Sequence, residues 1–228
     1  MIAFTADHGE MGGERGLWFK MSFYDGSARV PLIVSGPGVA RGRVAEPVSL
    51  LDLAPTFADL AAAAPGDHAY EGRSLAAALR SGAIGRGTVV SEYLAEGVTQ
   101  PAVMLRHGAH KLIRCPGDPD LLYDLSSDPH ETRDLAADAA SPALAALGAQ
   151  AEARWDLPAL RERVLASQAQ RRAVAAALAA GAHTPWDHQP VFDASRQYVR
   201  GPAAWHPRTG VPLVPGTLPG DPPQTLST

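Results

Sequence analysis

The chain opens with Ile2-Ala3-Phe4-Thr5-Ala6-Asp7-His8-Gly9-Glu10. Its apolar and small residues, free of turn formers, lead directly into Asp-His-Gly, which is typical of a buried strand in a parallel sheet. Ligands of open α/β sheets bind in the crevice beyond the strand ends. Asp7 offers oxygen to a hard cation, and His8 can coordinate a metal or donate a hydrogen bond to an anion. The stretch therefore predicts an α/β fold with a metal and anion site at a strand end; an ordinary loop is the alternative for these two residues alone.

Composition narrows the class of protein further. The 228 residues suffice for one domain or part of a larger one, and the net charge of -4 does not suggest a nucleic-acid partner. The one cysteine, Cys115, excludes an internal disulfide. The sequence has neither a transmembrane-length apolar run nor a signal-peptide layout at its start, so we expect a cytoplasmic protein without a membrane partner.

An interior parallel strand needs neighbours on both sides, so a chain that begins with one is expected to be the C-terminal part of a longer protein.

Periodicity predicts the elements of the first part of the chain. A second buried strand is expected over 30–34, and a short helix or turn over 22–28. Helical spacing covers 48–63, with Ser49 as its N-cap. Asp52 in this helix is expected to be solvated or to cap. A further short helix is expected over 74–79.

The period changes to two after Thr88. Four strands joined by short turns predict an antiparallel meander, and they cover 88–93, 102–106, 111–114 and 121–125. Helical composition follows over 141–181, with a break near Trp155 where Asp156 can cap. One apolar face of the second helix is expected to pack in a core, and it carries Leu157, Leu160, Val164 and Leu165. The expected domains are an α/β core (1–86), an antiparallel subdomain (87–137), a helical segment (138–182) and a tail (183–228) that is disordered after about 201.

The residues from Asp7 to Val34 resemble the sulfatase family of the alkaline-phosphatase-like superfamily. His8 directly after Asp7, with Lys20 twelve residues further on, is similar to the pattern of the choline-sulfatase branch. The segments 122–125 and 183–200 also resemble the C-terminal part of such enzymes. The resemblance implies the C-terminal part of a sulfatase fold: parallel-sheet strands and helices, then a small antiparallel four-stranded subdomain and C-terminal helices.

The resemblance also implies a site. Lys20 would be catalytic and contact the sulfate oxygens, while Asp7 and His8 would ligate a divalent metal, with Ca²⁺ expected and Mg²⁺ or Mn²⁺ as alternatives. The nucleophile of the family is a formylglycine made from Cys or Ser in a Cys/Ser-x-Pro/Ala-x-Arg signature. Cys115 does not match that signature, nor does any serine. The formylglycine is therefore expected in a missing N-terminal part, and the chain alone is expected to be inactive.

The implied function is hydrolysis of a sulfuric ester, with choline sulfate as the expected substrate. A quaternary ammonium is recognised by aromatic faces and carboxylates, so Glu96, Trp186 and Asp187 are the candidate substrate-binding residues. The full-length parent is expected to be a homo-oligomer. A phosphonate or phosphodiester hydrolase of the same superfamily is one alternative, and a non-catalytic oligomerisation remnant is another.

Overall fold

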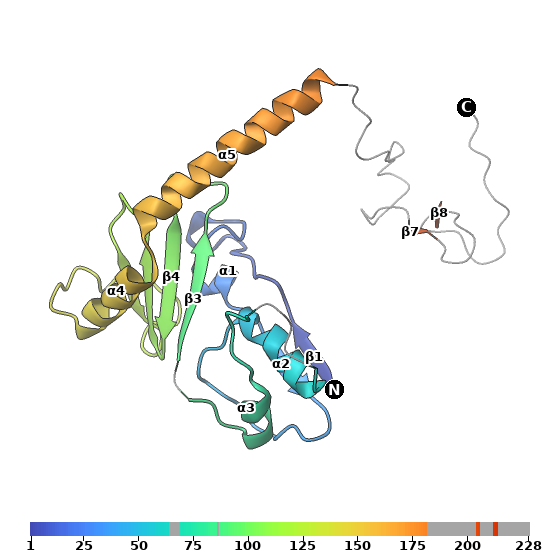
Figure 1. Cartoon of the computed structure of the whole chain (residues 1–228). Coiled ribbons are helices and arrows are strands. Elements are labelled where there is room, and N and C mark those ends of the chain that lie inside the picture. The colour runs from blue at the N-terminus through green and yellow to red at the C-terminus, as the bar shows by residue number, and fades with distance from the viewer. Residues whose placement is uncertain (64–68, 86, 182–203, 206–211, 214–228) are drawn as a thin grey trace. The chain divides into compact units, whose positions relative to one another are not determined.

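A computed structural model describes residues 1–63, 69–85, 87–181, 204–205 and 212–213, in two compact units over 1–170 and 171–228 (Figure 1). In chain order the elements are β1 (Ile2–Thr5), η1 (Glu14–Gly16), α1 (Asp25–Ala28), β2 (Leu32–Ser35), η2 (Leu50–Asp52), α2 (Leu53–Leu60), α3 (Ala76–Ser81), β3 (Thr88–Tyr93), β4 (Ala102–His107), β5 (His110–Arg114), β6 (Leu121–Asp124), α4 (Pro142–Arg154), α5 (Leu157–Ala180), β7 (Ala204–Trp205) and β8 (Pro212–Leu213). Within the described ranges, no helix is both long enough and apolar enough to cross a membrane.

The predicted antiparallel meander is confirmed. Strands β3, β4, β5 and β6 lie in sequence order in one sheet, and all three neighbouring pairs are antiparallel. The turn between β4 and β5 is short because Gly108 adopts a positive φ of 56°, a backbone conformation that glycine enters without steric cost. As in any extended strand, successive residues of each strand point to opposite faces of the sheet.

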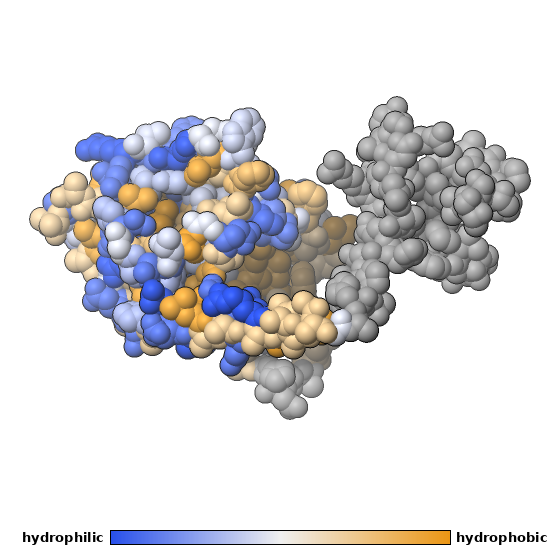
Figure 2. Space-filling view, turned by 90° about the horizontal axis from the view of Figure 1, so that it is seen from above, coloured by the Kyte–Doolittle hydropathy of each residue, from blue (hydrophilic) through white to orange (hydrophobic). Residues whose placement is uncertain are grey.

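The two faces of the meander are covered by different segments (Figure 1). On one face, Leu105, Leu112 and Leu122 form a buried cluster with Leu147 and Ala151 of α4. On the other face, Ala102 and Met104 of β4 pack with Phe23, which directly precedes α1. The segment around α1 is thereby anchored on a sheet that lies far away in the sequence. On the face shown in Figure 2, hydrophobic and hydrophilic residues are interspersed.

Strands β1 and β2 differ from the prediction in two respects. They form a two-stranded sheet in which Ile2 lies opposite Ser35, so this pairing is antiparallel and not parallel. Their apolar side chains are exposed rather than buried, with Ile2 at 73%, Phe4 at 61% and Ile33 at 60%. The loop between the strands contains η1 and α1 but no crossover helix of the kind that joins parallel strands.

A capping box begins the predicted helix of residues 48–63, which the structure divides into η2 and α2. The hydroxyl of Ser49 accepts a hydrogen bond from the amide of Leu51 at 3.2 Å, and the Asp52 carboxylate accepts one from the amide of Ser49 at 2.9 Å. The second carboxylate oxygen of Asp52 accepts from the amide of Arg73 at 2.8 Å. Asp52 is therefore a buried capping residue, one of the two roles that the sequence suggested.

Replacing Ser49 with alanine is expected to lower the free energy of unfolding by about 1 kcal/mol, because the first turn loses its side-chain acceptor. Urea unfolding followed by circular dichroism measures this. Ser35→Ala, at the exposed end of β2, is the matched control and should leave the midpoint unchanged. Equal effects of the two substitutions would contradict the capping role.

Helices α4 and α5 divide as predicted, and Asp156 accepts a hydrogen bond from the amide of Ala159 at 2.9 Å. The core packing predicted for the apolar face of α5 is wrong: none of its residues is buried, and Leu165 is 39% exposed. Arg161, Gln168 and Arg171 occupy positions that continue the spacing of the apolar residues, so the helix has no continuous hydrophobic stripe.

Candidate functional site

Three predicted site residues meet at the end of β1. Lys20 Nζ lies 2.8 Å from Nε2 of His8, and Asp7 Oδ2 lies 3.3 Å from the same nitrogen. The backbone amide of His8 donates to Asp7 Oδ1 at 3.0 Å, and this bond is the main reason why the pKa of the Asp7 carboxyl is lowered. A carboxylate and a lysine ammonium therefore both lie next to the same nitrogen of one imidazole.

The contacts of the His8 ring indicate its tautomer. Its Nδ1 lies 2.8 Å from the carbonyl oxygen of Gly9, and a carbonyl can only accept, so Nδ1 carries the hydrogen. Its Nε2 then accepts from the ammonium of Lys20. In this arrangement His8 holds and orients the lysine.

Gly9 and Gly26 pack closely against each other, and this contact brings Lys20 near His8. The amide of Gly9 donates to the carbonyl oxygen of Ser27 at 2.7 Å, and the Ser27 hydroxyl donates to the carbonyl oxygen of Lys20. A Cβ atom at Gly9 would lie 2.1 Å from the carbonyl oxygen of Gly26, a distance that no side chain tolerates. The buried Ser27 of α1 therefore connects the segment that carries His8 to the one that carries Lys20.

The donors here fit a divalent metal only in part. Asp7 offers a carboxylate that is 86% exposed, but His8 can ligate through Nε2 only after Lys20 has left that nitrogen. In the described part of the chain, no three His, Cys, Asp or Glu side chains are grouped so that they could hold a metal ion. Calcium takes six or more oxygen ligands, so these residues alone do not form a calcium site.

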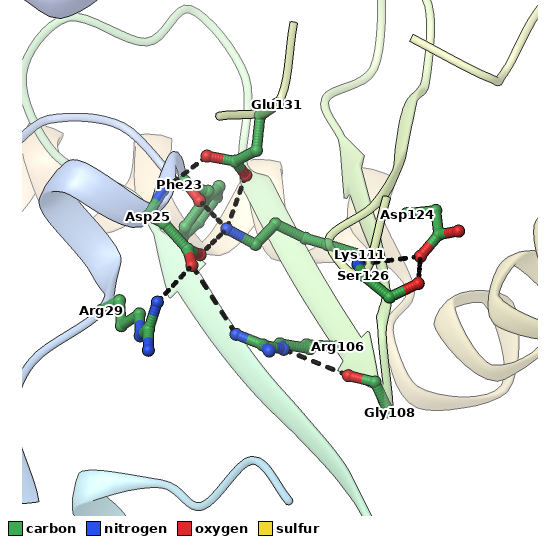
Figure 3. Close-up of polar contacts among 9 residues, drawn as sticks. All are labelled: Phe23, Asp25, Arg29, Arg106, Gly108, Lys111, Asp124, Ser126 and Glu131. Carbon is green, nitrogen blue, oxygen red and sulfur yellow. Dashed lines mark hydrogen bonds and ion pairs between the residues drawn. The ribbon is translucent and has the colours of Figure 1, made fainter. Parts of the chain in front are cut away.

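A buried ionic cluster supports this region, and sequence reasoning missed it (Figure 3). Lys111 of β5 is 1% exposed, and its ammonium donates to Glu131 Oε1 at 2.7 Å, to the carbonyl oxygen of Phe23 at 3.0 Å and to the Asp25 carboxylate. These partners are 20, 88 and 86 residues away in the sequence. The only local signal was a lysine in an apolar strand.

Arg15, a second cation in the loop that carries Lys20, makes its contacts away from the His8–Lys20 pair. Its guanidinium stacks over the ring of Tyr24 at 4.2 Å and donates to the carbonyl oxygen of His130 at 3.2 Å. The residue has a positive φ of 55°, a left-handed conformation that few residues other than glycine adopt. Arg15 therefore fastens the loop to the sheet rather than enlarging the positive charge of the site.

The structure describes one of the three predicted substrate-binding residues, Glu96. Glu96 is exposed in the loop after β3, where its carbonyl oxygen accepts from the hydroxyl of Tyr93 at 2.7 Å. Trp186 and Asp187 lie outside the described residues. Cys115 is partly buried, which raises the pKa of its thiol and fits its exclusion as a nucleophile.

Known families match most of the chain. Residues 13–152 match the family described as N-sulphoglucosamine sulphohydrolase, C-terminal, and residues 162–206 match the family described as choline sulfatase enzyme C terminal. A choline-sulfatase of Rhizobium meliloti (strain 1021) is 44% identical over 206 residues, which are 88% of this chain and 40% of that protein.

Solved structures resemble the fold. A 2-O GAG sulfatase superposes with a TM-score of 0.56 and 32% identity, over 75% of this chain and 37% of the other. A phosphonate monoester hydrolase from Silicibacter pomeroyi superposes with a TM-score of 0.53 and 31% identity, over 74% and 34%. The chain thus spans less than half the length of each of these relatives.

Proposed function

Because this chain belongs to the sulfatase family, we propose that it supplies the C-terminal part of a sulfuric ester hydrolase that acts on choline sulfate. The observation that carries the proposal is the meeting of Asp7, His8 and Lys20 at one strand end, with Lys20 Nζ 2.8 Å from His8 Nε2. The identity with a choline-sulfatase, at 44% over most of the chain, supports the choice of substrate.

In the proposed reaction the Lys20 ammonium contacts the oxygens of the sulfuryl group. Negative charge grows on the sulfuryl and leaving oxygens as the ester bond breaks, and a fixed cation stabilises that charge more in the transition state than in the bound substrate. His8 orients the ammonium through Nε2. The pair therefore places a positive charge without reorganisation during the reaction.

The remaining parts of the chemistry are proposed from the family. A formylglycine would supply the nucleophile, and a divalent metal, Ca²⁺ being expected, would polarise the sulfuryl oxygens. Asp7 is its proposed oxygen ligand, and His8 would join only on release of Lys20. For the quaternary ammonium we propose Glu96 together with Trp186 and Asp187. We also propose a homo-oligomeric parent enzyme.

Phosphonate monoester hydrolysis is the second candidate function. The phosphonate monoester hydrolase superposes on the chain almost as well as the 2-O GAG sulfatase, with TM-scores of 0.53 and 0.56. A lysine ammonium also interacts with the charged oxygens of a phosphonate as it does with those of a sulfate. The substrate preference therefore requires a direct comparison.

The proposal is tested on the gene product that contains these residues. We expect the DNA upstream of the Met1 codon to encode the formylglycine signature. For its product, kcat/KM should be at least 100-fold higher for choline sulfate than for a phosphonate monoester or a phosphodiester. The 228-residue chain alone is the control and should not hydrolyse a chromogenic aryl sulfate. The reverse preference would favour the phosphonate function, and lack of the upstream signature would favour a non-catalytic role.

A further inference from the structure

We infer that Lys111, Asp25 and Glu131 are positioning residues that set the place of the His8–Lys20 pair through α1. The inference rests on the proposed function only in taking the His8–Lys20 pair as part of a catalytic site. The three residues themselves touch neither His8 nor Lys20 in any described contact. They act through two successive links, one from the sheet to α1 and one from α1 to the site.

The first link joins β5 to the start of α1 (Figure 3). Lys111 Nζ donates to the carbonyl oxygen of Phe23 and to the Asp25 carboxylate. Glu131 completes a ring, because its Oε1 accepts from Lys111 at 2.7 Å and its Oε2 accepts from the amide of Asp25 at 2.7 Å. The first residue of α1 is thus held by both its backbone and its side chain.

The second link joins α1 to the site. Only one residue separates Asp25 from Ser27, which is buried and hydrogen-bonded within the same turn to the carbonyl oxygen of Tyr24. Ser27 in turn accepts from the amide of Gly9 and donates to the carbonyl oxygen of Lys20. A displacement of α1 therefore moves the residue after His8 and the backbone of Lys20 together.

The chemistry of the cluster favours a positioning role over simple packing. Apolar contacts are not directional, whereas three hydrogen bonds from one ammonium define the place of their acceptors. Arg106 and Arg29 each lie 3.8 Å from the second oxygen of Asp25, so two further cations restrain the orientation of this carboxylate. Glu131 keeps a positive φ of 56°, a conformation that persists where the surroundings impose it.

The test removes the charges of Lys111, Asp25 and Glu131 together. Arg106 and Arg29 lose the Asp25 carboxylate, but both side chains keep contact with solvent. The triple variant Lys111→Met/Asp25→Asn/Glu131→Gln is compared with the double variant Arg114→Met/Asp120→Asn. Arg114 is the matched control because it is another ion-paired cation of β5, bonded to Asp120 at 2.7 Å, on the opposite face of the sheet. Amide hydrogen exchange of Gly9 and the NMR shifts of the His8 ring report on the site, and the β4–β5 amides report on the fold.

We expect the triple variant to exchange the Gly9 amide at least 10-fold faster than the wild type while the β4–β5 amides keep their rates. Its His8 ring shifts should move toward those of Lys20→Met, in which the contact at Nε2 is absent. The control variant should change neither readout. Wild-type Gly9 exchange and His8 shifts in the triple variant would overturn the inference, and so would an increase shared equally with the β4–β5 amides.

A milder variant keeps the inference testable if the triple variant does not fold. Glu131→Gln alone keeps an oxygen that can accept from the Asp25 amide but weakens the bond to Lys111, so an intermediate rise in Gly9 exchange is expected; no rise would overturn the inference. No readout uses a substrate. Failure of the proposed function would appear in the turnover assay alone, and failure of the positioning role would appear in these spectra alone.

Discussion

Replacing Lys20 with methionine is expected to lower kcat for choline sulfate about 100- to 1,000-fold in the enzyme that contains this chain. The substitution keeps the length of the side chain but removes the ammonium that lies 2.8 Å from His8 Nε2. Loss of one preorganised group that stabilises transition-state charge costs about 2.7–4 kcal/mol of the activation free energy. Initial rates over a range of substrate concentrations separate kcat from KM.

The matched control for Lys20 is Arg41→Met, which removes another exposed cation from a different loop. It should leave kcat within twofold of the wild type. Lys20→Arg keeps the charge but not the geometry, so it should recover only part of the rate. A kcat for Lys20→Met within threefold of the wild type would remove Lys20 from the chemistry.

The second large effect is expected on stability. Lys111→Met should lower the free energy of unfolding by about 3–5 kcal/mol, because it leaves the carboxylates of Asp25 and Glu131 without their shared cation. Glu131 is itself only 2% exposed, so water cannot replace the lost hydrogen bond. Urea unfolding at neutral pH, followed by circular dichroism, measures the difference.

Two variants show whether the unpaired charge causes that loss. Arg114→Met breaks a partly exposed ion pair on the same strand and should cost no more than about 1 kcal/mol. The triple variant Lys111→Met/Asp25→Asn/Glu131→Gln should regain most of the stability, since the fully buried charges of Lys111 and Glu131 are both removed. If Lys111→Met and the triple variant were equally unstable, the loss would come from packing.

The antiparallel meander and the caps could be predicted because their causes are local. Alternation along β3 to β6 and the short turns determine a sheet of adjacent antiparallel strands. Ser49 and Asp156 cap helices through amides two and three residues away. The family and its fold were also correct, because the residues from Asp7 to Val34 form a long and specific string.

The errors concern features that depend on distant residues. Apolar composition suggested that β1 and β2 are buried and parallel, but composition states neither what covers a strand nor the direction of its partner. The same limit applies to Leu165 on α5. Lys111 could not be recognised because its partners come from segments at least 20 residues away.

For the candidate site, the sequence predicted which residues come together but not how they contact one another. The approach of Asp7, His8 and Lys20 followed from the resemblance, and the structure places them together. Their roles as metal ligands and catalytic residue stay predictions, as does substrate binding by Glu96. The contact between Lys20 and Nε2 of His8 was not foreseen, because a motif gives the spacing of residues but not their hydrogen bonds.

The hydrogen bond from the amide of Asp25 to Glu131 also has a consequence for synthesis on the ribosome. The two residues are 106 positions apart. At roughly 5–20 residues per second, Glu131 is added roughly 5–20 seconds after Asp25. The segment that carries Asp25 must wait during that interval without this anchor, so the contact between α1 and Glu131 can form only after the meander has been synthesised.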